Sequence, residues 1–139
     1  MVHTFDGFND FIRLQKGERL SDFLADFSPE EFPGAWVSGL GGVSEVTLGF
    51  YDLAAKEYRW KTFDGLREMT ALQGNLAYDG TGKLMLHAHG TFADAQYISV
   101  GGHVKDFITA GTVELFLHRS YKPLNRKQDE TVGLPLLDL

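Results

Sequence analysis

Residues 83–103 are Lys83-Leu-Met-Leu-His87-Ala-His89-Gly-Thr-Phe-Ala-Asp94-Ala-Gln-Tyr-Ile-Ser-Val-Gly101-Gly102-His103, and they contain three of the five histidines of the chain. Apolar or small residues occupy every second position from Leu84 to Phe92, which is the period of two typical of a half-buried β-strand. His87 and His89 therefore lie on the same face. We expect the chain to turn back after Asp94 and to pair antiparallel over residues 97–100, with two glycines allowing a bend or close approach before His103.

The histidine spacing suggests a metal site. Residues two apart on one strand face lie roughly 6–7 Å apart at Cα, close enough for two imidazoles to reach one ion. Three imidazoles with an open water position form a common catalytic zinc site, whereas structural zinc sites usually have four protein ligands, often thiolates. The chain has no cysteine. His87, His89 and His103 are thus candidate ligands of zinc or another divalent metal, and the alternative is that they are polar residues of a solvated strand and turn.

The composition predicts a soluble globular protein. The 139 residues fit one domain spanning 1–139, and 43% hydrophobic with 23% charged residues is typical of a folded chain rather than a disordered one. The first residues, Met1-Val-His-Thr-Phe-Asp6, show no signal-peptide pattern, and no apolar run approaches the length of about 18 residues that a membrane helix needs. With no cysteine either, we expect a cytoplasmic protein.

The charge disfavours direct binding to nucleic acid. The formal net charge is −6 and the sequence pI is about 5.2, whereas DNA binding depends on Lys and Arg side chains that neutralise phosphates. Two groups of basic residues could form local patches, and we expect both to be a solvated strand edge or tail. They are Lys56, Arg59 and Lys61, and Arg119, Lys122, Arg126 and Lys127. We expect DNA to be bound only weakly or through partners.

The N-terminal part predicts one strand and one helix. Residues 7–14 have a strand pattern that ends at a Lys16-Gly17 turn. Residues 18–27 predict a helix, because Leu20, Phe23, Leu24 and Phe27 recur at helical spacing and form one apolar stripe. A second short helical turn is predicted over residues 28–31, with proline at a position that tolerates it.

The rest of the chain predicts strands. The Gly39-Leu-Gly-Gly42 run is interpreted as a kink between two of them, Asp64-Gly65 as a turn, and Asp79-Gly-Thr-Gly82 as a hairpin loop. Residues 57–63 are expected to form a solvent-facing arm, and the tail from about residue 121 is polar until its last apolar residues dock on the body. The predicted strands are residues 35–40, 43–52, 57–63, 67–78, 84–92 and 112–118.

Three acidic residues are candidates for a catalytic base. Glu68, Glu114 or Asp94 could activate a metal-bound water if the fold brought the carboxylate within hydrogen-bond reach. No other catalytic motif is present. The glycine run lacks the Lys-Ser/Thr of a phosphate-binding loop, and no serine has the context of a nucleophile elbow.

Several short motifs along the chain resemble one known family, the plants and prokaryotes conserved domain (PPC, also written PCC). They are Gly17-Glu-Arg-Leu20, Ser38-Gly-Leu-Gly-Gly-Val43, Leu48-Gly-Phe-Tyr-Asp52, Lys56-Glu-Tyr58, Glu68-Met-Thr-Ala-Leu-Gln-Gly-Asn75, Asp79-Gly80, His87-Ala-His89, Gly101-Gly-His103 and Thr112-Val-Glu114. The resemblance implies an α+β fold, with a mainly antiparallel sheet and one main helix packed on it, assembled as a homotrimer. It also implies a metal, zinc in the first place, at His87, His89 and His103.

The resemblance leaves two functional hypotheses. Plant relatives join this domain to an AT-hook, a short Arg-Gly-Arg-Pro element that enters the minor groove, and this sequence has no such element. The preferred hypothesis is a trimeric, metal-binding assembly module, associated with DNA binding or transcription regulation through partner proteins. The alternative is a small zinc-dependent enzyme, a hydrolase or lyase, with the three histidines on the metal and Glu68 or Glu114 as base.

Overall fold

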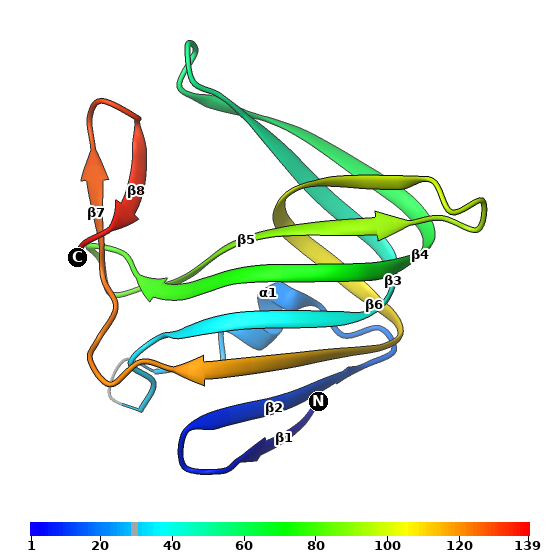
Figure 1. Cartoon of the computed structure of the whole chain (residues 1–139), viewed down its shortest axis with the longest axis horizontal. Helices are drawn as coiled ribbons and strands as arrows, with labels where there is room; N and C mark the ends of the chain where they lie inside the picture. Colours follow the sequence, from blue (N-terminus) through cyan, green and yellow to red (C-terminus); the bar gives the residue numbers. More distant parts are fainter. Residues whose placement is uncertain (29–30) are drawn as a thin grey trace.

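The computed structural model of the chain describes residues 1–28 and 31–139. Within them the chain forms eight strands and one short helix (Figure 1). In chain order these are β1 (Val2–Phe5), β2 (Asn9–Gln15), α1 (Leu20–Leu24), β3 (Ala35–Asp52), β4 (Glu57–Tyr78), β5 (Leu84–Ala93), β6 (Ser99–Arg119), β7 (Arg126–Asp129) and β8 (Leu134–Leu137).

Six strands form one antiparallel sheet in the order β1-β2-β6-β3-β4-β5. The first part of β6 also pairs with β5, so β3, β4, β5 and β6 form a closed ring of paired strands. The later part of β6 pairs with β2 on its other side. One long strand can serve both parts because the β3–β6 register shifts at three places, and such irregularities bend and twist a sheet. The mainly antiparallel architecture predicted from the sequence is confirmed.

Two glycine signals that were predicted to interrupt the strands lie inside continuous ones. The Gly39–Gly42 kink is present as a register shift within β3. The predicted turn at Asp64-Gly65 is wrong, because both residues lie within β4. Here the register passes from the Glu45–Asp64 pair to the Val43–Arg67 pair, and Gly65 takes a φ of +93° that favours glycine. The glycine accommodates a bulge rather than a chain reversal.

Helix α1 is shorter than predicted. It ends at Leu24 instead of continuing to Phe27, so the chain has only a minor helix where one main helix was expected. After Leu24 the backbone tightens into i to i+3 hydrogen bonds, and no basic residue in the last turn offsets the helix dipole. The apolar stripe still packs inward, with Leu20 and Phe23 buried. The predicted helical turn over residues 28–31 includes residues 29 and 30, which lie outside the described residues.

One face of the sheet is buried and the other is exposed. Alternate residues on the inner face build the core, which includes Phe92, Phe107 and Leu72. On β5 the inner residues Ala88, Gly90 and Phe92 are buried while His87 and His89 are exposed, as the alternation predicted. No helix in the described part of the chain is long and apolar enough to cross a membrane.

The last residues form a separate hairpin beside the sheet. Strands β7 and β8 pair with each other, and the hairpin contacts the far end of the β3–β4 hairpin, residues 49–60, which we call the arm. Figure 1 shows the arm projecting away from the main sheet, with β7 and β8 on the side toward which it extends. The Tyr51 hydroxyl donates to the Val132 carbonyl at 2.7 Å, and Lys56 donates to the Glu130 carbonyl.

Candidate metal centre

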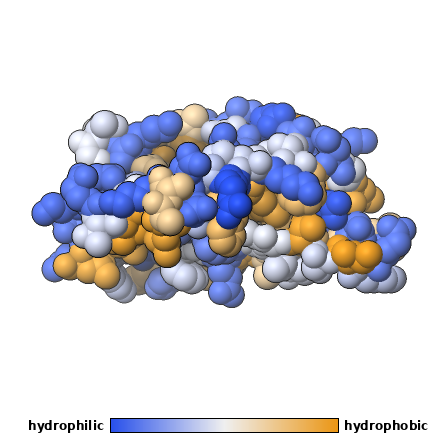
Figure 2. Space-filling model, turned by 90° about the horizontal axis from the view of Figure 1, so that it is seen from above, coloured by the Kyte–Doolittle hydropathy of each residue, from blue (hydrophilic) through white to orange (hydrophobic). Residues whose placement is uncertain are grey.

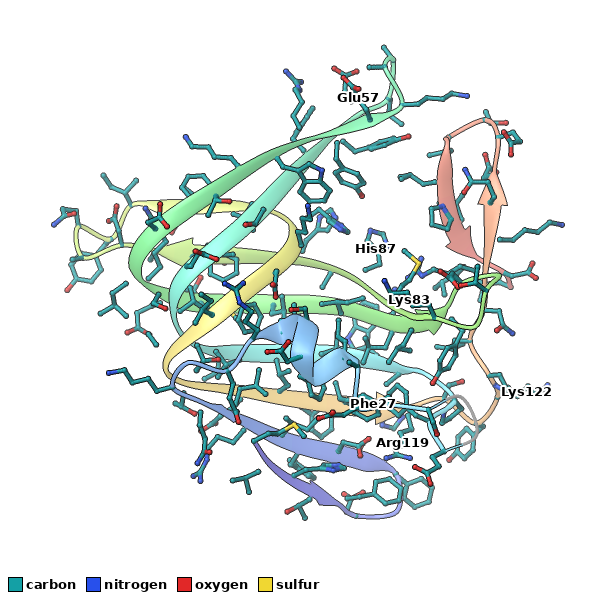
Figure 3. All side chains as sticks on the ribbon, turned by 180° about the vertical axis from the view of Figure 1, so that it is seen from behind. Phe27, Glu57, Lys83, His87, Arg119 and Lys122 are labelled. Atoms are coloured by element: carbon teal, nitrogen blue, oxygen red, sulfur yellow. The ribbon has the colours of Figure 1, made fainter. Side chains whose placement is uncertain are left out.

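Strand pairing brings the three predicted histidines together. His87 and His89 lie two apart on β5, and His103 on β6 is paired directly with His89. Because cross-strand partners share a face, all three imidazoles project from the outer face of the sheet. Their ligand atoms lie within 4.8 Å of one another, and their ring centroids are 5.4–5.7 Å apart. Figure 3 shows His87 on the side of the sheet that faces the arm and the β7–β8 hairpin.

The chemistry of this cluster fits a divalent metal. Nδ1 of His103 is buried and has no hydrogen-bond partner in the described part of the structure. A buried ring nitrogen without a partner is unfavourable unless something else binds it. Three neutral imidazoles suit zinc and similar transition metals, and a three-residue set leaves a coordination position open. No carboxylate of the described residues completes the cluster.

Partial burial keeps two of these histidines, His103 and His87, in the neutral form that binds metal. Burial lowers the pKa of His103 to about 4, and His87, His89 and Arg126 add smaller effects in the same direction. The pKa of His87 is also lowered, first by burial and then by the Arg126 charge and by His89. Both imidazoles are therefore neutral at pH 7, as metal coordination requires.

Two aromatic rings of the arm cover one side of the histidine cluster. The Tyr58 ring lies 4.8 Å from the His103 ring, and Trp60 stacks on Tyr58 at 4.5 Å. Gly49, the β3 partner of both Trp60 and His103, makes room for them, since a Cβ there would lie 2.6 Å from the indole. The prediction that residues 57–63 face solvent is thus wrong for Tyr58, which covers His103, and holds for the exposed Glu57, Arg59 and Lys61. Lys56, expected to be solvated with Arg59 and Lys61, is exposed as well.

Arg126 is a site residue that the sequence did not reveal. It was predicted to lie in a solvated tail, but only 6% of it is exposed. Its guanidinium donates to the Asn75 side-chain oxygen, and Asn75 is the cross-strand partner of His87. The other members of its predicted basic group lie elsewhere: Arg119 pairs with Asp10, and Lys122 and Lys127 are exposed. No local pattern marks Arg126, because long-range contacts place it here: just before it, the Leu124 carbonyl accepts from the Tyr78 amide at the end of β4.

The three acidic candidates lie away from the histidines. Glu68 is paired with Ala93, four residues beyond His89 on β5, which is about 13 Å along the strand. Glu114 lies in another part of the sheet, opposite Leu40 and Arg13. Asp94 caps the β5–β6 turn, where it accepts from the Gln96 and Ile98 amides, and it pairs with Arg67 at 3.7 Å. The polar neighbours of the histidines are amides, a phenol and a guanidinium instead.

Comparison with known protein families finds one match that covers most of the chain. A sequence model described as the Plants and Prokaryotes Conserved (PCC) domain matches residues 7–120. The matched region includes all three histidines and ends before Arg126. Among proteins with curated functions, none is detectably similar in sequence.

Solved structures share the whole fold. A protein of Ralstonia eutropha, described as a "putative DNA-binding protein", is 28% identical with a TM-score of 0.90, covering 99% of this chain and 95% of its own. A metal-containing protein of Archaeoglobus fulgidus is 26% identical with a TM-score of 0.83, covering 100% and 99%. A plant- and prokaryote-conserved protein of Pyrococcus horikoshii is 23% identical with a TM-score of 0.83, covering 99% and 95%.

Proposed function

The chain belongs to the Plants and Prokaryotes Conserved (PCC) domain family, and from this membership we propose that it is a homotrimeric module that binds a divalent metal through His87, His89 and His103. The convergence of the three imidazoles carries the proposal. A cluster this tight on the exposed face of a sheet, with a buried and unpartnered ring nitrogen, is more than a solvated strand requires. The metal content of the Archaeoglobus relative supports it.

Zinc is the metal that we propose first. It binds imidazole nitrogens, needs no thiolate, and accepts three protein ligands with a fourth position open. The catalytic alternative is less well supported, because neither Glu68 nor Glu114 lies near the histidines to act as base. We therefore favour a binding and assembly module over a hydrolase or lyase.

Elemental analysis of single-histidine variants tests the metal proposal. The full chain is stripped with a chelator, reloaded with zinc, desalted, and measured for bound metal. We expect one zinc per chain in the wild type and a loss of most of it in His87→Ala, His89→Ala and His103→Ala. His118→Ala is the matched control, since His118 is bonded to Asn9 on another part of the sheet. Equal zinc in all four variants would overturn the proposal.

An apolar region of the outer face supports the homotrimer. A groove of about 640 Å³ crosses β2, β3, β4 and β6 there, next to large exposed hydrophobic side chains. The exposed residues on this face include Phe11, Trp36, Leu40 and Phe116. Figure 2, which views the molecule from above, shows exposed hydrophobic surface in orange as several patches among hydrophilic ones. Monomeric proteins rarely leave such a surface uncovered, and three copies are the assembly that the family resemblance implies.

The apolar region and the histidines are neighbours on one face. Trp36 is paired with Asn75, and Asn75 with His87, so a second copy seated on the apolar region would border the metal site. Light scattering on a sizing column tests the assembly. We expect three times the 15.5 kDa chain mass, and Leu40→Glu, which puts a charge into the groove, should shift the mass toward the monomer. A wild-type monomer at micromolar concentration would refute the trimer.

We propose that any role with DNA runs through protein partners. The Ralstonia relative carries a DNA-binding description, but this chain has a net charge of −6. The described residues also contain only one helix, of five residues, which is too short to serve as a recognition helix in the major groove.

A further inference from the structure

Arg126 carries a buried charge that the protein does not neutralise. Within the described residues it forms no ion pair, and its guanidinium bonds only to neutral oxygens, the Pro135 carbonyl and the Asn75 side chain. The Nε atom is buried and has no hydrogen-bond partner among the residues that the structure describes. Burying a guanidinium normally requires an anion beside it, because the loss of hydration is large.

Arg119 shows how the same chain treats an arginine with a structural role. Its guanidinium makes two hydrogen bonds to the carboxylate of buried Asp10, at 2.6 and 2.7 Å. It also lies over the rings of Phe5 and Phe32. Within residues 1–28 and 31–139, Arg126 has neither a carboxylate partner nor an aromatic ring stacked on its guanidinium, although it is the more buried of the two. The buried charge of Arg126 is therefore suited to binding an anion that comes from outside the chain.

The location of Arg126 says where that anion would bind. Asn75, which accepts from Arg126, is the cross-strand partner of His87 on the outer face. The guanidinium is also near enough to lower the pKa of both His87 and His103. A divalent metal on three neutral imidazoles would add two further positive charges at this point, with no acidic residue in the histidine cluster.

We propose that this site takes a small organic carboxylate, held between the open position of the metal and the guanidinium of Arg126. The inference rests on the proposed function, because the metal supplies one half of the anion's binding site. A planar guanidinium matches a carboxylate through parallel hydrogen bonds. The rings of Tyr58 and Trp60 beside His103 offer apolar surface to the organic part of such a ligand. Inorganic phosphate has no organic part that could contact these rings.

A titration of the cobalt-loaded full chain tests the inference without assuming any activity. Cobalt(II) suits imidazole sites, and its visible spectrum reports ligands entering its coordination shell. Sodium propionate should change this spectrum saturably, while propionamide, the uncharged counterpart, should not. Arg126→Met should weaken propionate binding about tenfold or more, the usual effect of losing charge-assisted hydrogen bonds. The neighbouring Lys127→Met, at an exposed position on the same strand, should bind propionate like the wild type.

The possible results separate this inference from the proposed function. If the wild type holds no cobalt, the metal proposal fails and this inference fails with it. If it holds cobalt but propionate leaves the spectrum unchanged, or inorganic phosphate binds in its place, only the carboxylate inference is overturned. Should Arg126→Met fail to fold, Arg126→Lys keeps the charge without the planar fork and should still bind propionate severalfold more weakly. Wild-type affinity in either variant contradicts the role of Arg126.

Discussion

His103 is the most enclosed of the three histidines, because it lies across from β5 and beneath the Tyr58 ring. Its pKa is lowered from 6.5 to about 4, mainly by burial. Between these two values the unfolded chain takes up a proton at His103 and the folded chain does not. The unfolded state therefore binds more protons in this window, and the free energy of unfolding must fall as the pH falls.

The metal-free protein should accordingly lose stability between pH 6.5 and about pH 4. Urea denaturation of chelator-treated protein across this range measures the slope. In His103→Gln the slope should become shallower, because the titrating imidazole is gone, whereas His118→Gln should keep the wild-type slope. Identical pH dependence in His103→Gln and the wild type would mean that His103 does not titrate abnormally.

Strands whose faces differ in polarity could be predicted from the sequence, and long-range placements could not. The alternation over residues 84–92 correctly assigned His87 and His89 to one face. The expected antiparallel return after Asp94 is also present, with Val100 paired to Phe92. The Asp64-Gly65 signal failed because a glycine with positive φ serves a bulge as well as it serves a turn. The burial of Arg126 was not predicted, because its partners Asn75 and Pro135 lie on two different strands, and Asn75 is 51 positions away in the sequence.

One side-chain hydrogen bond from Tyr51 helps to hold the β7–β8 hairpin against the arm. The Tyr51 hydroxyl donates to the Val132 carbonyl, so Tyr51→Phe should lower the free energy of unfolding by about 1 kcal/mol. Hydrogen exchange should become faster over residues 126–137, where Arg126 is anchored. Tyr97→Phe is the matched control, because Tyr97 is 89% exposed and its change should have no effect. Unchanged exchange in Tyr51→Phe would show that the hairpin is held by other contacts.

At the scale of the whole molecule, the net charge predicts how tightly the protein binds DNA. With a net charge of −6, the isolated chain should bind duplex DNA no more tightly than non-specific levels at physiological salt. Fluorescence anisotropy with a labelled duplex at about 0.15 M salt measures this, near the ionic strength at which surface charges are well screened. Nanomolar, sequence-selective binding would contradict a role through partners and favour direct regulation of DNA.

The closed ring of strands β3 to β6 forms the three-histidine site, because the pairing of β5 with β6 places His103 opposite His89. X-ray absorption spectroscopy of the zinc-loaded protein tests this account most directly, because it counts and identifies the ligands of the ion. We predict three imidazole nitrogens at about 2.0–2.1 Å and at least one oxygen from water or a bound carboxylate. A spectrum with fewer than three imidazoles, or with a shell of oxygen atoms alone, would contradict the three-histidine site.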